Sequence, residues 1–179
     1  MLADVARLWR VVDPDRFDET HRLLTLPLQM LVDERRRLSA GLAANYYRQV
    51  RREAGITSTF EFTLPGPVDR EKLATSLTVT GPVARGKALR QGANVTEAAR
   101  RAFVATSGSV SRHALDAGRE TVLGALRDDP KLEYRWYRVT SGTPCDFCQM
   151  LAGRGAVYRE DTAGFKAHDH CGCYPAPSL

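Results

Sequence analysis

The sequence predicts an α+β protein that is mostly α-helical, with a helical body over residues 1–130 followed by a small module of strands and loops over residues 131–179. Three observations support this fold class. Apolar residues recur at three- and four-residue steps through most of the first 130 positions, which is the period of a helix. Residues 132–140 then change to aromatic and β-branched types with alternating polarity, which is typical of a strand. All four cysteines follow this strand, between Cys145 and Cys173.

The helical body begins with three segments of helical period. Residues 2–12 predict a short amphipathic helix, and residues 17–26 predict a second one that Pro27 either kinks or restarts. Residues 28–53 give the strongest helical pattern, and Gly55 supplies a stop signal directly after it. The charged residues on the outer face of this helix are interpreted as an ordinary solvated surface.

The second half of the body is interrupted more often. Residues 56–67 predict a connector or an edge strand. Asp69 begins a further helix, which we expect Gly81-Pro82 to interrupt. Thr96 is a good N-cap for a long helix that we expect to loosen at Ser107-Gly108-Ser109.

The C-terminal module combines a strand with a cysteine knuckle. After the predicted strand over residues 132–140, Cys145 and Cys148 lie on a loop, and residues 156–158 are expected to pair back on that strand. Trp136 is expected in the core. A segment this short has little apolar mass, so a metal ion or disulfides must hold it together.

Two cysteine pairs with histidines between them predict a metal centre. The segment Cys145-Asp146-Phe147-Cys148 is followed by His168-Asp169-His170-Cys171-Gly172-Cys173. Zinc takes four Cys or His ligands in a tetrahedron, and a C-x-x-C turn lets two thiolates face one point. Because the protein can fill every position, we expect a closed, structural Zn²⁺ site and therefore a zinc-stapled module. Two disulfides or free core thiols are the alternatives.

The ligand set itself is less determined than the site. The candidates are Cys145, Cys148, His168, His170, Cys171 and Cys173. Four of them are enough for a tetrahedral ion. Our preferred set is Cys145, Cys148, Cys171 and His168, with Cys173 or His170 as substitutes.

Composition excludes some classes of protein. The chain has 179 residues, of which 43% are hydrophobic, enough for one ordinary core. It contains no apolar run long enough for a membrane span, and its N-terminus lacks the pattern of a secretory signal. Cysteines in a metal-like pattern fit a reducing compartment better than a disulfide scaffold.

The positive charge is concentrated in one region. The chain has a net charge of +5, and the window from Gly81 to Arg112 holds six basic residues against one acid, Glu97. These basic residues are candidates for contacts with nucleic-acid phosphates. A solvated basic face is the simpler interpretation. The candidates are Arg85, Lys87, Arg90, Arg100, Arg101 and Arg112.

An enzyme is not expected. The sequence His168-Asp169-His170 is similar to the histidine pair of a ββα-metal nuclease, but that fold needs a helix after the pair. Nine residues follow His170, and two of them are proline. The chain also shows no Ser/His/acid constellation for nucleophilic catalysis.

The cysteine-rich segments resemble the MuF-like minor head proteins of tailed bacteriophages, also called head morphogenesis proteins. The resemblance rests on T-P-C-D-F-C-Q-M-L-A-G-R-G-A-V-Y and F-K-A-H-D-H-C-G-C-Y-P-A-P. The family signature is C-x-x-C-x-x-L-x-G, a spacer, then H-x-x-C-x-C. Its positions are filled here by Cys145, Cys148, Leu151, Gly153, His168, Cys171 and Cys173. The helical segment Ala43–Gly55 is similar to the versions found in phages of actinobacteria.

The resemblance implies a low-copy structural component of the phage head that acts in capsid assembly. It implies the portal protein and the major capsid protein as partners, self-association in several copies, and contact with packaged double-stranded DNA in some systems. The expected location is the virion, in the head interior or at the portal vertex, and the host cytoplasm during assembly. Some relatives carry a fused protease or toxin domain, and we expect the bare module here. The alternative function is that of a zinc-knuckle nucleic-acid-binding protein.

Overall fold

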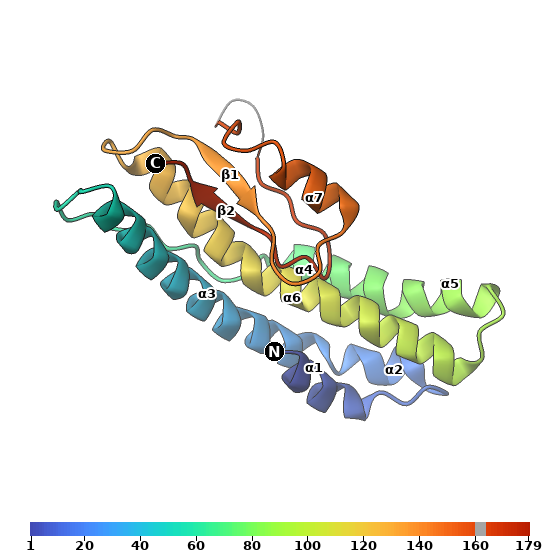
Figure 1. Ribbon diagram of the computed structural model, residues 1–179. Coiled ribbons are helices and arrows are strands. Elements are labelled where there is room, and N and C mark those ends of the chain that lie inside the picture. Colours follow the sequence, from blue (N-terminus) through green and yellow to red (C-terminus); the bar gives the residue numbers. More distant parts are fainter. Residues whose placement is uncertain (160–163) are drawn as a thin grey trace. The chain divides into compact units, whose positions relative to one another are not determined.

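The computed structural model describes residues 1–159 and 164–179. The chain is mostly helical with one two-stranded sheet, which confirms the predicted fold class (Figure 1). It divides into two compact units, each made from separate stretches of the chain. The first unit comprises Met1–Arg35, Pro67–Ala114 and His168–His170; the second comprises Arg36–Gly66, Leu115–Ala167 and Cys171–Leu179. The sequence predicts a boundary at residue 130 between a helical body and a small C-terminal module. Whether each of these parts folds by itself stays a prediction.

The helices and strands follow in this order. The helical elements are α1 (Leu2–Leu8), η1 (Trp9–Val11), α2 (Phe17–Arg22), α3 (Thr25–Glu53), α4 (Arg70–Thr78), η2 (Val79–Val83), α5 (Ala84–Arg90), α6 (Val95–Asp128) and α7 (Asp146–Ala152). The strands are β1 (Trp136–Val139) and β2 (Tyr174–Pro177). No helix in the described residues combines the length and the apolar character needed to cross a membrane.

The first unit is built around aliphatic side chains. Its main core comes from α1, α3, α4 and α6, and its buried members are Val5, Leu24, Leu28, Leu31, Val32, Val68, Leu73, Leu77 and Val110. Asp69 caps α4 by accepting from the backbone N–H groups of Glu71 and Lys72. This cap and the buried face of α4 account for the predicted helix start.

Proline has different effects at two places in this unit. Pro27 lies in the first turn of α3, where the missing N–H removes no helical hydrogen bond, so the helix restarts at Thr25. At Gly81-Pro82 the expected interruption of the α-helix is confirmed, because α4 ends at Thr78, a π turn follows, and the α-helix resumes as α5 at Ala84. The chain passes from α4 into α5 through the π turn η2, whose wider loop accommodates the proline ring (Figure 1).

Gly81 allows a close approach inside the same π turn. A Cβ atom there would lie 2.3 Å from His21 Nε2, so only glycine leaves room for the buried imidazole. The His21 ring stacks on Phe17 at 5.2 Å and meets Trp9 edge-on at 5.6 Å. Burial lowers the pKa of His21, a shift that the nearby Asp18 carboxylate opposes.

The second unit contains the sheet. β1 and β2 pair antiparallel, with Trp136 opposite Pro177 and Val139 opposite Tyr174, and Trp136 also forms a bridge with Tyr158 (Figure 1). This bridge confirms the predicted return of residues 156–158 to the first strand. β2 was not expected, because its sequence is Tyr-Pro-Ala-Pro. Its two prolines alternate, so their missing N–H groups fall on one side, which an edge strand tolerates.

The core of the second unit is aromatic and contains buried charge. Tyr47, Trp136 and Tyr158 are buried with Leu126. Arg51 pairs with Asp129, and both side chains are buried. Arg51 also donates to the Ser58 carbonyl at 2.8 Å, and the Tyr47 hydroxyl meets Asp129 at 3.4 Å.

α3 ends in this unit as the sequence predicts. Gly55 has φ +74°, and its N–H donates to the Arg52 carbonyl at 3.0 Å. The N–H of Ile56 donates to the Arg51 carbonyl at 2.9 Å. These two bonds satisfy the last carbonyls of the helix, which is the motif that glycine favours after a helix end.

α6 runs without a break, so the loosening expected at Ser107-Gly108-Ser109 is wrong. The glycine has a packing role instead. A Cβ at Gly108 would lie 2.4 Å from His170 Nε2 within the first unit. Gly118 has a similar role in the second unit, where a Cβ would lie 2.6 Å from the Ser39 hydroxyl on α3.

Candidate metal centre

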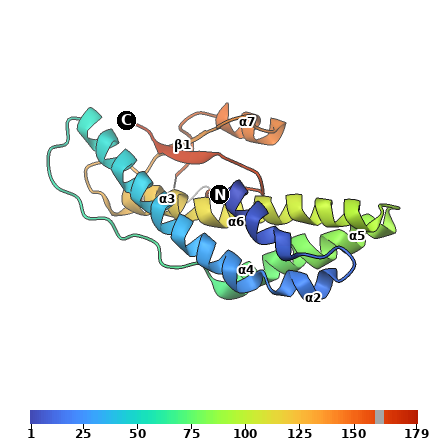
Figure 2. The same ribbon diagram turned by 90° about the horizontal axis from the view of Figure 1, so that it is seen from below.

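Two segments of the second unit position the four cysteines. Cys145 is the N-cap residue of α7, and Cys148 lies in the first turn of that helix. They are three positions apart in the chain, so both side chains point to the same side of the helix start. Cys171 and Cys173 directly precede β2, which begins at Tyr174. Figure 2 shows α7 beside β1.

The sulfur atoms converge. The Sγ atoms of Cys148, Cys171 and Cys173 lie within 4.8 Å of one another, and the Sγ of Cys145 lies within 4.8 Å of that of Cys148. The Cys148 and Cys171 sulfurs are 3.6 Å apart. Four zinc–sulfur bonds of tetrahedral geometry place sulfurs about 3.8 Å apart, so the cluster has the size of a zinc site. None of the four cysteines forms a disulfide within the described residues, and this cluster could hold a metal ion.

The four thiols differ in their exposure to solvent. Cys148, Cys171 and Cys173 are buried, whereas Cys145 is exposed. Phe165 and Ala167 pack against the three buried cysteines. Burial raises the pKa of the Cys148 thiol. Such thiols hold their protons until a cation of high affinity replaces them.

Arg119 of α6 fixes the second cysteine pair. Its Nε donates to the Cys173 carbonyl at 2.9 Å and its Nη2 to the Cys171 carbonyl at 2.7 Å, while its Nη1 bonds Asp116 at 2.7 Å. The side chain is buried. Three directed bonds from one rigid guanidinium therefore set the position of the segment that carries two of the sulfurs.

Arg138 of β1 is the second buried guanidinium at the cluster. Its Nη2 donates to the Lys166 carbonyl at 2.9 Å, and its plane lies 4.0 Å from the centre of the Phe165 ring. Burial raises the pKa of the Cys173 thiol, and the Arg138 guanidinium beside that sulfur lowers it. Sequence reasoning missed both arginines, because no motif or spacing marks them.

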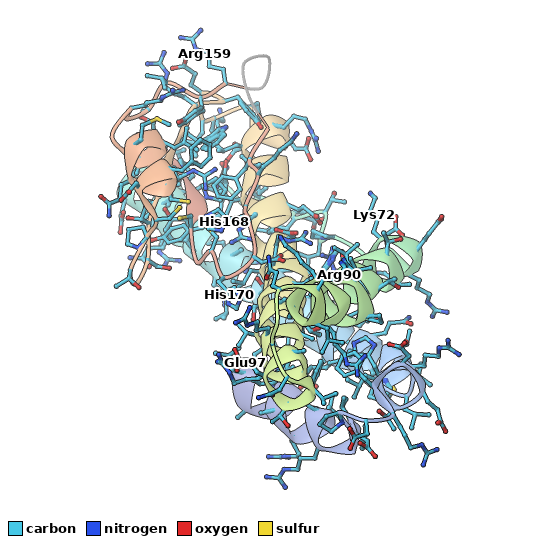
Figure 3. All side chains as sticks on the ribbon, turned by 90° about the vertical axis from the view of Figure 1, so that its right-hand side faces the viewer. Lys72, Arg90, Glu97, Arg159, His168 and His170 are labelled. Atoms are coloured by element: carbon cyan, nitrogen blue, oxygen red, sulfur yellow. The ribbon has the colours of Figure 1, made fainter. Side chains whose placement is uncertain are left out.

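The two candidate histidines belong to the first unit. His168 is exposed, and its Nδ1 lies 2.8 Å from the Asp169 carbonyl. His170 has φ +62° and its ring rests against Gly108 of α6 (Figure 3). Between them, the Asp169 carboxylate accepts from Arg112 Nε at 2.8 Å. Within the second unit, the structure therefore brings together the four cysteines.

The candidate nucleic-acid residues of the first unit are mostly engaged in protein contacts. Arg85 donates to the Pro14 carbonyl and lies over the Phe17 ring. Arg112 is bonded to Asp169. Lys87 and Arg90 are exposed on α5, and Arg90 is labelled on this helix in Figure 3.

The remaining two basic candidates share one acid on α6. Arg100 and Arg101 both bond Glu97, at 2.7 Å and 2.9 Å. These two bonds lower the pKa of Glu97 to about 2. The carboxylate is therefore ionised and offsets part of the local positive charge.

A family model described as "VG15 protein" matches residues 1–179, the whole chain. No curated protein and no solved structure matches the sequence.

Proposed function

Because the chain belongs to the VG15 family, a family of phage proteins, over its whole length, we propose that it is a minor structural protein of the phage head that acts in capsid assembly. The family match supports a phage structural or morphogenesis protein in general. The specific role in the head rests on the signature C-x-x-C-x-x-L-x-G and H-x-x-C-x-C, which this chain fills from Cys145 to Cys173.

The observation that carries the proposal is the cysteine cluster with its anchor. Four sulfurs converge, and Arg119 bonds the backbone of the second cysteine pair to α6. A site closed by protein ligands stabilises a fold and leaves no position for substrate. We propose that Zn²⁺ holds the second unit in this way, with His168 as an alternative ligand, and that the protein has a structural rather than a catalytic role.

The proposed location is the head interior or the portal vertex, with the portal protein and the major capsid protein as partners and several copies per particle. Large apolar side chains are exposed on α3 and α7, including Leu26, Met30, Leu42, Phe147 and Met150. Exposed apolar side chains of this size are common at contacts between proteins. They support a role in assembly and do not name a partner.

Quantitative mass spectrometry of purified phage heads tests this proposal. Isotope-labelled peptides give the ratio of this chain to the portal protein in empty and in DNA-filled heads. We expect a few copies per portal ring in both. Presence in empty heads alone would identify an assembly factor that leaves the particle. Absence from both kinds of head would contradict the proposed structural role.

Phages that carry variants of this protein allow the same measurement to test the role of the cysteine cluster. Cys148→Ser removes a buried ligand candidate, and Ser141→Ala removes a nearby hydroxyl that donates to the Gly172 carbonyl at 2.8 Å. We expect Cys148→Ser to reduce incorporation into heads strongly, whereas Ser141→Ala leaves it near the wild-type level. Equal incorporation of both variants would show that the cysteine cluster does not serve head assembly.

A further inference from the structure

A pocket of about 470 Å³ lies in the second unit, at the C-terminal end of α3 (Figure 1). The end of α3 forms one side of this pocket, and the loop of residues 55–60 forms the other. The helix supplies three arginines, Arg48, Arg51 and Arg52, and the loop supplies the hydroxyl groups of residues 57–59. None of the described residues that line the pocket is acidic. The lining is therefore rich in donors for an anion.

Arg51 holds the loop in place and adds no free charge. Its side chain is buried, and the ion pair with Asp129 compensates the guanidinium. Its Nη2 donates to the Ser58 carbonyl at 2.8 Å and to the Ser58 hydroxyl at 2.9 Å. The guanidinium also lies over the Phe60 ring, 5.2 Å from its centre. Because a guanidinium presents its donors in fixed directions, these contacts fix the loop beside the helix.

The Ser58 hydroxyl keeps a proton to donate. Its oxygen accepts from Arg51, and a hydroxyl can accept and donate at the same time. The side chain is exposed, and no acceptor in the part of the chain that the structure describes takes this proton. Thr57 and Thr59, on either side of Ser58, are also exposed and line the pocket. The loop therefore offers neutral donors next to the arginines.

Arg48 and Arg52 carry the uncompensated positive charge of the pocket. Both side chains are exposed. Arg48 donates to the neutral side-chain carbonyl of Asn45 at 2.8 Å, and Arg52 forms no ion pair within the described residues. Glu53 accepts from Gln49 at 2.9 Å instead. Residues four apart share one helix face, where like charges repel each other, so an anion held between the two arginines would remove this repulsion.

The end of the helix opposes an anion only weakly. A helix C-terminus carries roughly half a negative charge, on carbonyls that lack partners. Here the Arg51 and Arg52 carbonyls accept from the N–H groups of Ile56 and Gly55. The two full charges on Arg48 and Arg52 therefore exceed the negative end of the helix dipole.

A phosphate group fits these donors best. Arginine binds phosphate through two parallel N–H···O bonds, and Ser and Thr hydroxyls are common partners of phosphate oxygens. A carboxylate has only two oxygens for a larger set of donors. The pocket has the volume of sites that hold small molecules, so it also has room for the group to which the phosphate is attached.

We propose that this pocket binds a phosphate group, with Arg48 and Arg52 as the charged donors and Ser58 as a neutral donor. Free phosphate and the phosphates of a nucleic-acid backbone share this chemistry, and the tests below separate these two sources. The inference goes beyond the proposed function and depends neither on zinc nor on a place in the head. The site also lies in a different unit from the basic candidates between Arg85 and Arg112.

Fluorescence anisotropy with a short labelled DNA duplex tests the nucleic-acid source. The double variant Arg48→Gln/Arg52→Gln is compared with the full-length wild-type protein. The matched control is Arg127→Gln/Arg154→Gln, which removes two exposed arginines of the same unit outside the pocket. Loss of two phosphate contacts should reduce the slope of log affinity against log salt concentration by about 1–2, because each contact releases counter-ions. The control should keep the wild-type slope.

Calorimetric titration with inorganic phosphate tests the free source in the same proteins. Binding that the pocket variant loses and the control variant keeps would support the proposal. A response of the duplex alone would identify backbone phosphate as the ligand, and a response of inorganic phosphate alone would identify free phosphate. If neither ligand distinguishes the pocket variant from the control, the proposal is overturned.

A conservative variant separates binding from folding. Arg48→Lys/Arg52→Lys keeps both charges and loses the paired donors, so it should recover part of the affinity. Both positions are exposed, and unchanged helical circular dichroism would show that the variants fold. An affinity of the lysine variant no higher than that of the glutamine variant would contradict a charged contact with the ligand. The copy number in phage heads tests the proposed function separately.

Discussion

The two units of this chain are stabilised in different ways. The first unit buries aliphatic side chains from α1, α3, α4 and α6. The second unit buries aromatic rings, three of the four cysteines and four arginines, Arg36, Arg51, Arg119 and Arg138. Aliphatic burial needs no partner with defined geometry, whereas each buried guanidinium needs an anion or a set of carbonyls in a fixed direction.

This difference follows from the length of the elements. The strands of the second unit have four residues each, and α7 has seven. Elements this short bury little apolar area, so directed bonds and, in our proposal, a metal ion supply what the hydrophobic effect does not. The first unit should therefore depend mainly on packing, and the second mainly on charge and metal.

Loss of a buried cysteine should have the largest effect, and it should be confined to the second unit. Structural zinc contributes about 10–16 kcal/mol of apparent binding free energy in small modules. We expect Cys148→Ser to abolish zinc binding and to remove amide protection in residues 136–158 and 171–179. Protection in α1, α4 and α5 should persist. Hydrogen exchange read by mass spectrometry distinguishes the two regions. Simultaneous loss of protection in both would contradict the contrast.

The ion pair Arg51–Asp129 should come next. Asp129→Ala leaves the Arg51 guanidinium buried without its carboxylate, which typically costs about 3–5 kcal/mol. The neighbouring Asp128 is the matched control, because it pairs with Arg127 at the surface. Asp128→Ala should change the free energy of unfolding by less than about 1 kcal/mol. Urea unfolding of the zinc-loaded protein measures both. Similar values for the two variants would show that the buried pair contributes little.

Two glycines of the first unit should respond in opposite directions to alanine. At Gly81 the new Cβ would overlap the buried His21 ring, and overpacking of this kind costs about 1–3 kcal/mol. At Gly86 the new Cβ would approach only the flexible end of Arg90, at 3.4 Å. Gly86→Ala should therefore be neutral or stabilise α5 by up to about 1 kcal/mol. Thermal unfolding measures both. Stabilisation by Gly81→Ala would show that the imidazole moves aside freely.

The smallest predicted effect is a pH dependence of the first unit. Burial lowers the pKa of His21 below its ordinary value of 6.5, so the folded state favours the neutral ring. Its contribution to stability is then complete above pH 6.5 and is lost as the pH falls below that value. We expect His21→Gln to show a weaker loss of stability between pH 7.5 and pH 5 than wild type. Parallel losses in both proteins would exclude His21 as the cause.

The sequence predicted the elements that local patterns determine. The helical period located α1, α3 and α6, and the stop at Gly55 follows from its position after an apolar run. The spacing Cys145-x-x-Cys148 predicted that two sulfurs would converge, and they do. The expected loop is wrong for Cys148, because this residue lies in the first turn of α7.

Other features depend on contacts between distant segments and leave no local pattern. In the sequence, Gly81 and Gly108 indicate only an interruption or loosening of a helix. In the structure, each glycine also makes room for an imidazole ring. β2 contains two prolines, which count against a strand unless it is an edge. Arg119 and Arg138 are two among many arginines in the sequence, and only the folded chain shows that they face the cysteines.

Hydrogen exchange of the full-length wild-type protein, with zinc bound and after complete removal by a chelator, tests the contrast between the units most directly. We predict that metal removal lowers protection in α7, β1 and β2, while α1, α4 and α5 keep theirs. Return of zinc should restore the protection. Unchanged protection of α7, β1 and β2 after verified zinc loss would contradict the account, because packing alone would then hold the second unit together.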